Sequence, residues 1–168
     1  DSTIMRDRSR SPRHSVYANT VAGTKGKFDP NNVIGEGQCK YVTKGRNSNG
    51  EWTADKFLKS GATFEDTCFL DDVRAAEHSL PLIAAFHQYL ATTPYAECVS
   101  VKVNVPQVWH QTGGGENDGQ LMLVEPYIKN FRKFNSNTGA FAAECAVAHA
   151  LSHFSYHASD GRELLCDL

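Results

Sequence analysis

The 168-residue chain is predicted to adopt an α+β fold. Three observations predict it. Asn47-Ser48-Asn49-Gly50 is a hairpin signal between two segments of β character. Residues 63–90 carry apolar side chains at helical spacing, and residues 140–156 are rich in alanine. Strands, a helix, more strand and a second helix follow one another in an order typical of a single α+β domain.

Residues 1–16 are predicted to form a disordered basic arm, because four arginines stand among Ser, Asp and Pro with almost no apolar content. Residues 17–168 then form one domain with a core of its own. The formal net charge of −2 argues against a nucleic-acid partner for the chain. No apolar run approaches the about 18 residues of a transmembrane helix. Five scattered cysteines are typical of reduced thiols, so we expect an intracellular, cytoplasmic protein.

The first predicted strands lie in residues 33–58. Residues 33–43 have the pattern strand, glycine turn, strand, and residues 51–58 are a third strand. Gly35-Glu36-Gly37 leaves a backbone that can approach a phosphate, although the same turn also occurs in plain hairpins. Alternation places Lys56 on the face of Trp52 and Leu58, which we predict to point inward. From there a lysine presents its ammonium to an anionic partner.

The second half of the chain holds the other predicted elements. Pro81 is expected to kink or divide the 63–90 helix, on which Asp71, Asp72 and Glu77 are candidate partners of Lys56. Residues 99–109 and 121–124 are predicted strands. A last apolar strand, residues 164–166, would deliver Asp167 at its end, a common position for catalytic groups.

Three further segments carry possible chemistry beside a plain structural role. Glu125-Pro126 ends a strand and can offer a carboxylate to a base. Residues 133–139 place a lysine and two asparagines around a turn, where amides also occur without any function. Four residues spaced by four form a stripe on the last helix, of which at most two neighbours can bind one zinc ion; they are Cys145, His149, His153 and His157.

With these segments in order, the chain resembles the alpha-kinase family of atypical serine/threonine protein kinases over about residues 30–168. The resemblance is carried by Gly35-Glu36-Gly37, Lys56, residues 123–128, residues 133–139, residues 152–156 and residues 165–168. It implies a two-lobed, protein-kinase-like fold whose C-terminal lobe is incomplete. It also implies that residues 17–168 are a catalytic domain truncated at its C-terminal end.

The resemblance also implies roles for particular residues. Gly35, Gly37, Lys40 and Lys56 would contact the phosphates of ATP, Glu125 and Tyr127 would hold adenine, and Lys133, Asn137 and Asp167 would form the catalytic cleft. Asp167 would orient the hydroxyl of a protein substrate or accept its proton. His153 would be the first ligand of a zinc ion that the complete domain binds. The implied cofactors are therefore ATP and Mg²⁺, with Zn²⁺ in the complete domain.

Two departures from the family pattern bear on activity. Lys40 stands where the family usually has arginine, and Asp55 stands where alanine is common, so that its carboxylate would attract Lys56. The second metal-binding aspartate and the other zinc ligands do not occur within the 168 residues. We therefore expect little kinase activity from this polypeptide alone. The alternatives are a non-catalytic kinase-like module that binds nucleotide or a protein partner, and a small zinc-binding structural domain.

Overall fold

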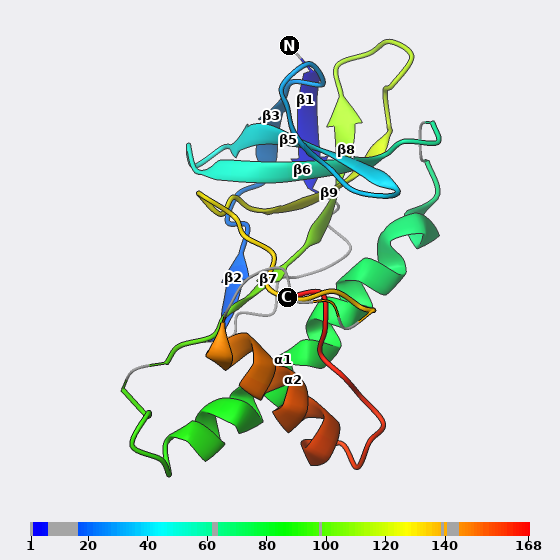
Figure 1. Cartoon of the computed structure of the whole chain (residues 1–168). Helices are drawn as coiled ribbons and strands as arrows, with labels where there is room; N and C mark the ends of the chain where they lie inside the picture. The colour runs from blue at the N-terminus through cyan, green and yellow to red at the C-terminus, as the bar shows by residue number, and fades with distance from the viewer. Residues whose placement is uncertain (1, 7–16, 62–63, 98, 139, 141–144) are drawn as a thin grey trace. The chain divides into compact units, whose positions relative to one another are not determined.

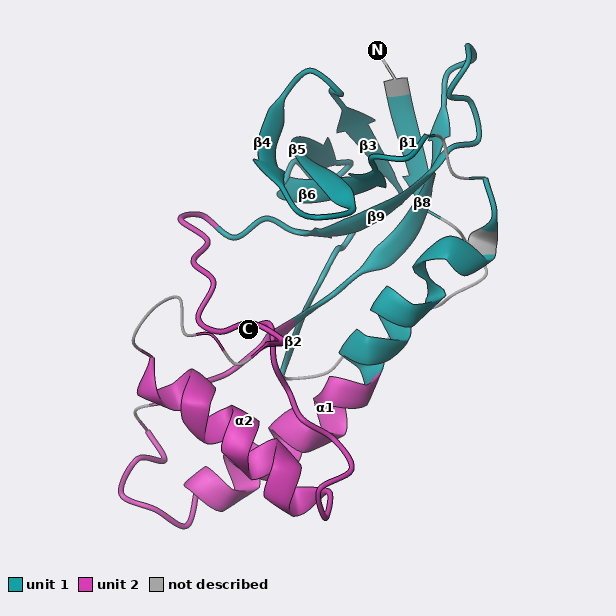
Figure 2. Ribbon diagram, turned by 45° about the vertical axis from the view of Figure 1, so that its right-hand side comes forward, with its two compact units in different colours: residues 1–77, 104–128 teal, residues 78–103, 129–168 magenta. Residues whose placement is uncertain are grey.

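The computed structural model describes residues 2–6, 17–61, 64–97, 99–138, 140 and 145–168. It divides into two compact units, and Figures 1 and 2 identify their elements and residues. The first unit comprises residues 1–77 and 104–128, and the second comprises residues 78–103 and 129–168. Within the described residues, none of the helices has the length and apolar character needed to cross a membrane.

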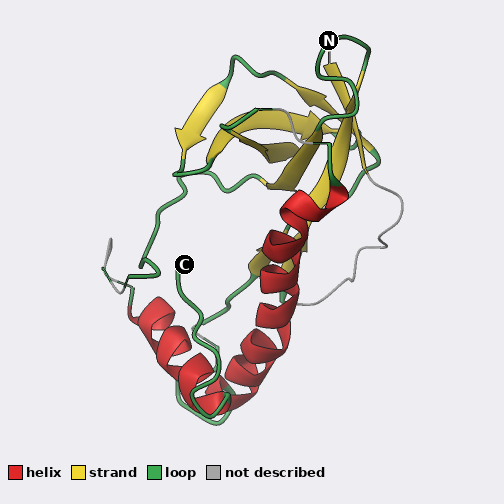
Figure 3. Cartoon of the chain, turned by 90° about the vertical axis from the view of Figure 1, so that its right-hand side faces the viewer, coloured by secondary structure: helices red, strands yellow, loops and turns green. Residues whose placement is uncertain are grey.

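Strands make up most of the first unit, and the helices in Figure 3 are a 21-residue and a 13-residue element. In chain order the elements are β1 (Ser2–Arg6), β2 (Ala18–Thr20), β3 (Lys25–Phe28), β4 (Val33–Glu36), β5 (Lys40–Asn47), β6 (Trp52–Leu58), the 3₁₀ turn η1 (Asp66–Phe69), α1 (Leu70–Leu90), β7 (Val103–Val105), β8 (Gln107–Thr112), β9 (Leu121–Pro126) and α2 (Ala146–Ala158).

The main sheet of the first unit closes on itself. Its strand order is β3-β1-β8-β9-β6-β5-β4, and β3 also pairs with β5. This additional pairing joins Gly26 to Asn47 and Lys27 to Arg46 in antiparallel register. The sheet therefore forms a small barrel, with β4 attached along β5.

Two apolar clusters cover the two faces of this sheet. The cluster in the barrel interior consists of Ile4, Val21, Phe28, Trp109, Met122 and Val124, with Phe57 packed against it. The cluster on the outer face consists of Phe69, Val73, Val108, Leu121 and Leu123, with Leu58 packed against it. Because η1 and the start of α1 supply Phe69 and Val73, they seal the outer face of β8 and β9.

Alternation along β6 places Asp55 and Lys56 on opposite faces. Asp55 is paired with Val124 of the interior cluster, and Lys56 is paired with Leu123 of the outer cluster. The prediction that Lys56 points inward is therefore wrong, although the alternation itself is confirmed. The prediction assumed that Trp52, on the same face as Lys56, is buried in the barrel interior, but Trp52 is 44% exposed.

The second unit is built around the packing of α1 on α2. The ring of Phe154 lies 5.3 Å from that of Phe86 and 5.6 Å from that of Tyr89, measured between centroids. Ile83 and Leu151 are buried beside them. His87 accepts a hydrogen bond from the Val101 backbone N–H at 2.9 Å, which ties the following loop to α1.

The structure confirms the hairpin at Asn47–Gly50 and both predicted helices, with later starts at Leu70 and Ala146. Pro81 lies inside α1 without dividing it. The predicted 99–109 strand is two strands, β7 and β8, on either side of Pro106, which has no N–H to donate to a ladder.

Two predictions about the chain ends need correction. Residues 164–166 form no strand. The arm predicted to be disordered over residues 1–16 contains β1, which pairs with both β3 and β8 because Ile4 is an interior core residue. The rest of that prediction, residues 7–16, lies outside the described residues, as do Cys98, Gly139 and residues 141–144 of the predicted helix.

Asp55 is a carboxyl group inside the barrel. Its side chain is fully buried, and neither of its oxygens has a hydrogen-bond partner among the described residues. Burial raises the pKa of Asp55 to about 7, and the hydroxyl of Thr53, which is nearby but not within hydrogen-bonding geometry, opposes this rise only in part. Between about pH 4 and pH 7 the folded chain therefore binds more protons than the unfolded chain, so its stability falls as the pH rises through this window.

We predict that Asp55→Asn, which keeps the shape and removes the titration, stabilises the chain at pH 8 relative to its effect at pH 5. The relative gain should reach about 2–3 kcal/mol, the part of a shift of about three pKa units that is lost between pH 5 and pH 8, because the unfolded carboxyl is already largely ionised at pH 5. Urea unfolding followed by tryptophan fluorescence at both pH values measures it. Glu116→Gln, at an exposed loop position, is the matched control and should show no such difference. An equal effect of Asp55→Asn at both pH values would contradict a raised pKa.

Candidate functional site

Lys56 and Glu125 form the central pair of the first unit. The Lys56 Nζ donates to the Glu125 Oε1 at 2.6 Å, from adjacent strands β6 and β9. The side chains are 28% and 15% exposed, so the pair is partly shielded from water. An ammonium has three donors and a carboxylate has a second oxygen. Both groups therefore keep capacity for a ligand, and the expectation that Asp55 attracts Lys56 is not met.

Lys40 has a different carboxylate from the one expected. It stands at the start of β5 and pairs with Asp72 in the first turn of α1. Its Nζ also lies 5.7 Å from the centroid of the Phe69 ring. Asp72 was a predicted partner of Lys56, but the structure assigns it to Lys40, because Lys56 is already held by Glu125. The pair anchors the beginning of β5 to α1.

The glycine turn between β4 and β5 is closed by a hydrogen bond from the Gly37 N–H to the Lys40 carbonyl at 2.9 Å. Lys59 pairs with Glu36 and so fastens the turn to the end of β6. A Cβ added at Gly35 or Gly37 would approach no atom closer than 3.7 Å, and neither residue has a positive φ. The fold does not require glycine at either position, so the open backbone itself is what these residues provide.

Tyr127 follows β9 directly. Its backbone N–H donates to the Trp52 carbonyl at 3.1 Å, which continues the pairing of β6 and β9 past the strand end. Its ring lies 4.4 Å from the Lys44 Nζ. Tyr127 and Glu125 are therefore fixed on the same strand end, beside Lys56.

In the second unit, Asp167 is paired with Lys133. Asp167 has a φ of 64°, in the left-handed region that aspartate tolerates better than most residues. The residue after it is tied down by Asn135, whose Oδ1 accepts the Leu168 N–H at 2.9 Å. The Phe134 N–H donates to the Leu168 carbonyl at 2.6 Å.

Asn135 is one of the two asparagines that the sequence analysis noted at this turn, but no role was assigned to it. It is buried, and its Nδ2 donates to the Ser152 Oγ of α2 at 3.1 Å while its oxygen holds Leu168. One amide thus connects α2, the turn at residues 133–139 and the segment that carries Asp167. The sequence did contain a signal, since an amide can both donate and accept, but Asn137 of the same turn has an equal claim on that ground.

A cavity of about 130 Å³ lies beside this amide and is lined in part by Asn135, Asn137, His149, His153 and Cys166. Two imidazoles and a thiol are donors that zinc prefers. Within the described part of the chain, however, no three His, Cys, Asp or Glu side chains are placed to hold one ion. The role of His153 as a zinc ligand therefore stays a prediction. Asn137, which was predicted to belong to the catalytic site, is an exposed residue at the wall of this cavity.

A family model for the alpha-kinase family matches residues 32–168. Solved structures share the fold. An alpha kinase from Entamoeba histolytica is 16% identical, with a TM-score of 0.66 over 86% of this chain and 58% of that chain. The alpha-kinase domain of myosin-II heavy chain kinase A in complex with adenosine is 16% identical, with a TM-score of 0.67 over 86% and 68%.

An inactive form of the alpha-kinase domain of myosin heavy chain kinase A, in complex with ATP, is 16% identical, with a TM-score of 0.70 over 99% of this chain and 77% of that chain. The chain thus spans 58% to 77% of the length of these three solved chains. None of the curated proteins matches it in sequence.

We predict that Asn135→Ala lowers the free energy of unfolding by about 1–3 kcal/mol, because it leaves the Leu168 N–H without its side-chain acceptor and removes the amide that donates to the Ser152 oxygen. Exchange of the Leu168 amide with solvent should accelerate. Urea unfolding and hydrogen exchange measure the two effects. Asn137→Ala, at an exposed position two residues away, is the control and should leave both nearly unchanged. Similar losses in the two variants would show that the turn as a whole, and not the Asn135 amide, holds this segment.

Proposed function

The chain belongs to the alpha-kinase family. On that premise we propose that the whole protein is a serine/threonine protein kinase that transfers the γ-phosphate of ATP to a hydroxyl of a protein substrate, and that this polypeptide alone has little activity. The observation that carries the proposal is the pair of Lys56 and Glu125. It presents one cation and one carboxylate side by side, partly buried and each with unused bonding capacity. A nucleotide needs both, since its phosphates are anionic and its adenine carries an amino donor.

On the nucleotide side, we propose that Lys56 and Lys40 contact phosphate oxygens. Charge-assisted hydrogen bonds of this kind are among the strongest in proteins. Glu125 accepts a hydrogen bond from adenine, with Tyr127 at the same strand end. Gly35 and Gly37 let the backbone of the turn approach the phosphates, which is supported by the absence of any structural need for glycine there.

On the acceptor side, Asp167 is proposed to receive the proton of the substrate hydroxyl as its oxygen attacks the γ-phosphorus and ADP departs. The ammonium of Lys133 fixes the orientation of this carboxylate through their ion pair. Asn135 acts indirectly, by holding the neighbouring Leu168. Asn137 is proposed to bind substrate or phosphate from the wall of the cavity in the second unit.

Structural Zn²⁺ does not find a full ligand set among the described residues, whereas Mg²⁺ in kinases needs only one or two carboxylates beside the nucleotide phosphates. Within the described residues no group of three or more acidic, histidine or cysteine side chains is arranged around one point. No step of the proposed reaction is assigned to either ion. Asp167 and His153 remain the residues through which this chain would contribute single ligands.

The bounds of the catalytic domain and the cellular compartment of the protein are also proposals. We propose that residues 17–168 belong to the catalytic domain together with β1 (Ser2–Arg6), which is a strand of its barrel. The thiols of Cys39, Cys68, Cys145 and Cys166 are all free, which supports a reducing, intracellular compartment. For the substrate of the whole protein, we propose only that it is a protein segment with a serine or threonine hydroxyl.

The proposal is tested by nucleotide binding to residues 1–168, because the chain spans only part of the solved kinases it matches. We predict that Lys56→Met lowers the affinity for ATP about tenfold or more and leaves the affinity for adenosine unchanged, since the lysine contacts phosphate. Glu125→Ala should weaken both ligands. Isothermal titration of each variant with ATP and with adenosine measures this, and Lys102→Met, at an exposed lysine of the second unit, is the control.

The outcomes separate the interpretations. Equal loss of ATP and adenosine in Lys56→Met would contradict a phosphate contact. Nucleotide binding by the wild type that ignores the phosphates would favour the alternative, a non-catalytic module. No binding of either ligand to the folded chain would reject a nucleotide site in these residues.

A second prediction concerns the glycine turn. Gly37→Ala should leave the free energy of unfolding within about 0.5 kcal/mol of the wild type, because the new Cβ meets no atom closer than 3.7 Å. ATP affinity should nevertheless fall severalfold, since the methyl group obstructs the phosphates. Gly50→Ala is the opposite case: its φ of 81° requires glycine, so we expect lower stability with unchanged ATP affinity. Thermal unfolding and ATP titration of both variants give the comparison.

A further inference from the structure

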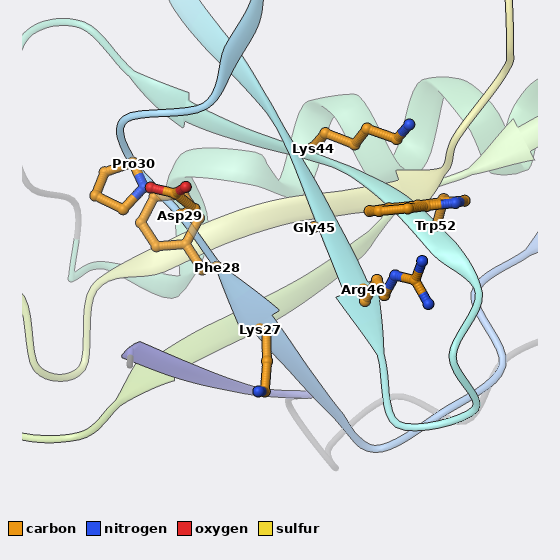
Figure 4. A pocket seen from close by; sticks show the side chains of 8 residues that line it. All are labelled: Lys27, Phe28, Asp29, Pro30, Lys44, Gly45, Arg46 and Trp52. Atoms are coloured by element: carbon orange, nitrogen blue, oxygen red, sulfur yellow. The ribbon is translucent and has the colours of Figure 1, made fainter.

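A hollow of about 570 Å³ lies on the outer face of β3, β5 and β6. Neither Lys56 nor Glu125 lines it, although Lys44 connects it to the neighbouring ring of Tyr127. Its lining includes four cationic or acidic side chains and one indole, namely Lys27, Asp29, Lys44, Arg46 and Trp52. Figure 4 shows them from close by. All five belong to the first unit, so the hollow is a feature of that unit alone.

The strand register gathers three cations on one side of the hollow. Lys27 of β3 is directly opposite Arg46 of β5, and Arg46 is directly opposite Trp52 of β6. Residues opposite one another in antiparallel strands project from the same face, as do residues two apart on one strand. Lys27, Lys44 and Arg46 are therefore neighbours by construction of the barrel, and not by chance orientation of long side chains.

Trp52 fixes two of these cations. The Lys44 Nζ lies 4.0 Å and the Arg46 Cζ lies 3.8 Å from the centre of the indole. In Figure 4 they lie on opposite sides of the ring. A cation on an aromatic face is held in place without losing its charge. The two heads are thus preorganised and remain electrostatically available.

No carboxylate among the described residues neutralises this group. Within that part of the chain, Lys27, Lys44 and Arg46 form no ion pair, whereas Lys40, Lys56 and Lys133 each do. The one acidic residue that lines the hollow, Asp29, accepts the Asn31 backbone N–H at 2.9 Å instead. Three cations and one carboxylate leave the hollow with an excess of two positive charges, which matches a phosphate group near neutral pH.

From this geometry we infer that the hollow bounded by Lys27, Lys44, Arg46 and Trp52 binds a phosphate monoester carried by a protein segment. The phosphate oxygens accept hydrogen bonds from the guanidinium of Arg46 and the ammonium of Lys27, while Lys44 adds charge. The choice of a protein-borne phosphate rests on the proposed function, since a protein kinase produces such groups on its own substrates.

The same contacts argue against single-stranded nucleic acid as the occupant. Binding of unpaired bases relies on aromatic rings with an open face for stacking. Both sides of Trp52 are occupied by Lys44 and Arg46, so no base can stack there without displacing the cations. The ligand is therefore recognised through its phosphate and not through a base.

Titration of residues 1–168 with a neutral Gly/Ala-rich peptide that carries one phosphoserine tests the inference. Of the two tryptophans, Trp109 is fully buried and Trp52 lies at the hollow, so the fluorescence of Trp52 reports binding. At fixed ionic strength we expect saturable binding of the phosphopeptide and none of the unphosphorylated peptide. Lys27→Gln and Arg46→Gln should each weaken it about tenfold.

Lys25→Gln is the matched control, because Lys25 is an exposed lysine of the same strand and face that does not line the hollow. Equal weakening in this variant would overturn the inference in favour of general surface charge. Unphosphorylated peptide binding as tightly, inorganic phosphate binding as tightly as the phosphopeptide, or binding only to anionic lipid vesicles would each overturn it as well.

The titration contains no nucleotide, so its outcome is independent of the ATP titrations. Binding of the phosphopeptide without binding of ATP would support the phosphate site in the hollow and contradict the proposed kinase function. Binding of ATP without binding of the phosphopeptide would contradict the phosphate site in the hollow and leave the proposed kinase function supported. Circular dichroism of each variant confirms that the barrel is intact before affinities are compared.

Discussion

The barrel of the first unit depends on one close approach, the pairing of β3 with β5. There is no room for a side chain on the inner side of this contact. A Cβ at Gly26 would lie 2.9 Å from the Arg46 carbonyl oxygen and from the Trp109 ring, and one at Gly45 would lie 2.0 Å from an Asp55 oxygen. Cβ atoms do not occur at such distances, so these two glycines permit the sheet to close.

Closure of the barrel determines the surroundings of the residues that follow in β6. With the interior filled by Trp109 and its neighbours, Asp55 is enclosed without a hydrogen-bond partner among the described residues, and Lys56 is forced to the outer face. There it meets Glu125 of β9, which has the same orientation on the adjacent strand. A single alternation thus produces both an unfavourable buried carboxyl and a preorganised cation. The same closure places Lys27 beside Arg46 on the outside.

The sequence predicted what is local and missed what depends on partners distant in the chain. The hairpin at Asn47–Gly50 follows from turn chemistry within four residues, and the structure confirms it. The prediction that Lys56 points inward was wrong, because it assumed that the apolar ring of Trp52 is buried, whereas this ring lies outside and holds two cations. Contacts between residues far apart in the chain decide the rest: no periodicity links Lys40 to Asp72 or Asn135 to Leu168. Residues 164–166 look like a strand, but side-chain hydrogen bonds hold this end of the chain without any ladder.

Two ways of holding a cation have different consequences for an incoming phosphate. Lys40, Lys56 and Lys133 are paired with carboxylates, so a phosphate that contacts them must share or displace an existing partner, and only the difference in interaction energy favours binding. Such pairs fix geometry more than they supply affinity. Lys44 and Arg46 are held by Trp52 through attraction to its ring, which leaves their charge uncompensated. A phosphate that binds there would displace no carboxylate of the described residues. The first arrangement suits a ligand that must be positioned and then released after reaction, and the second suits one that is simply retained.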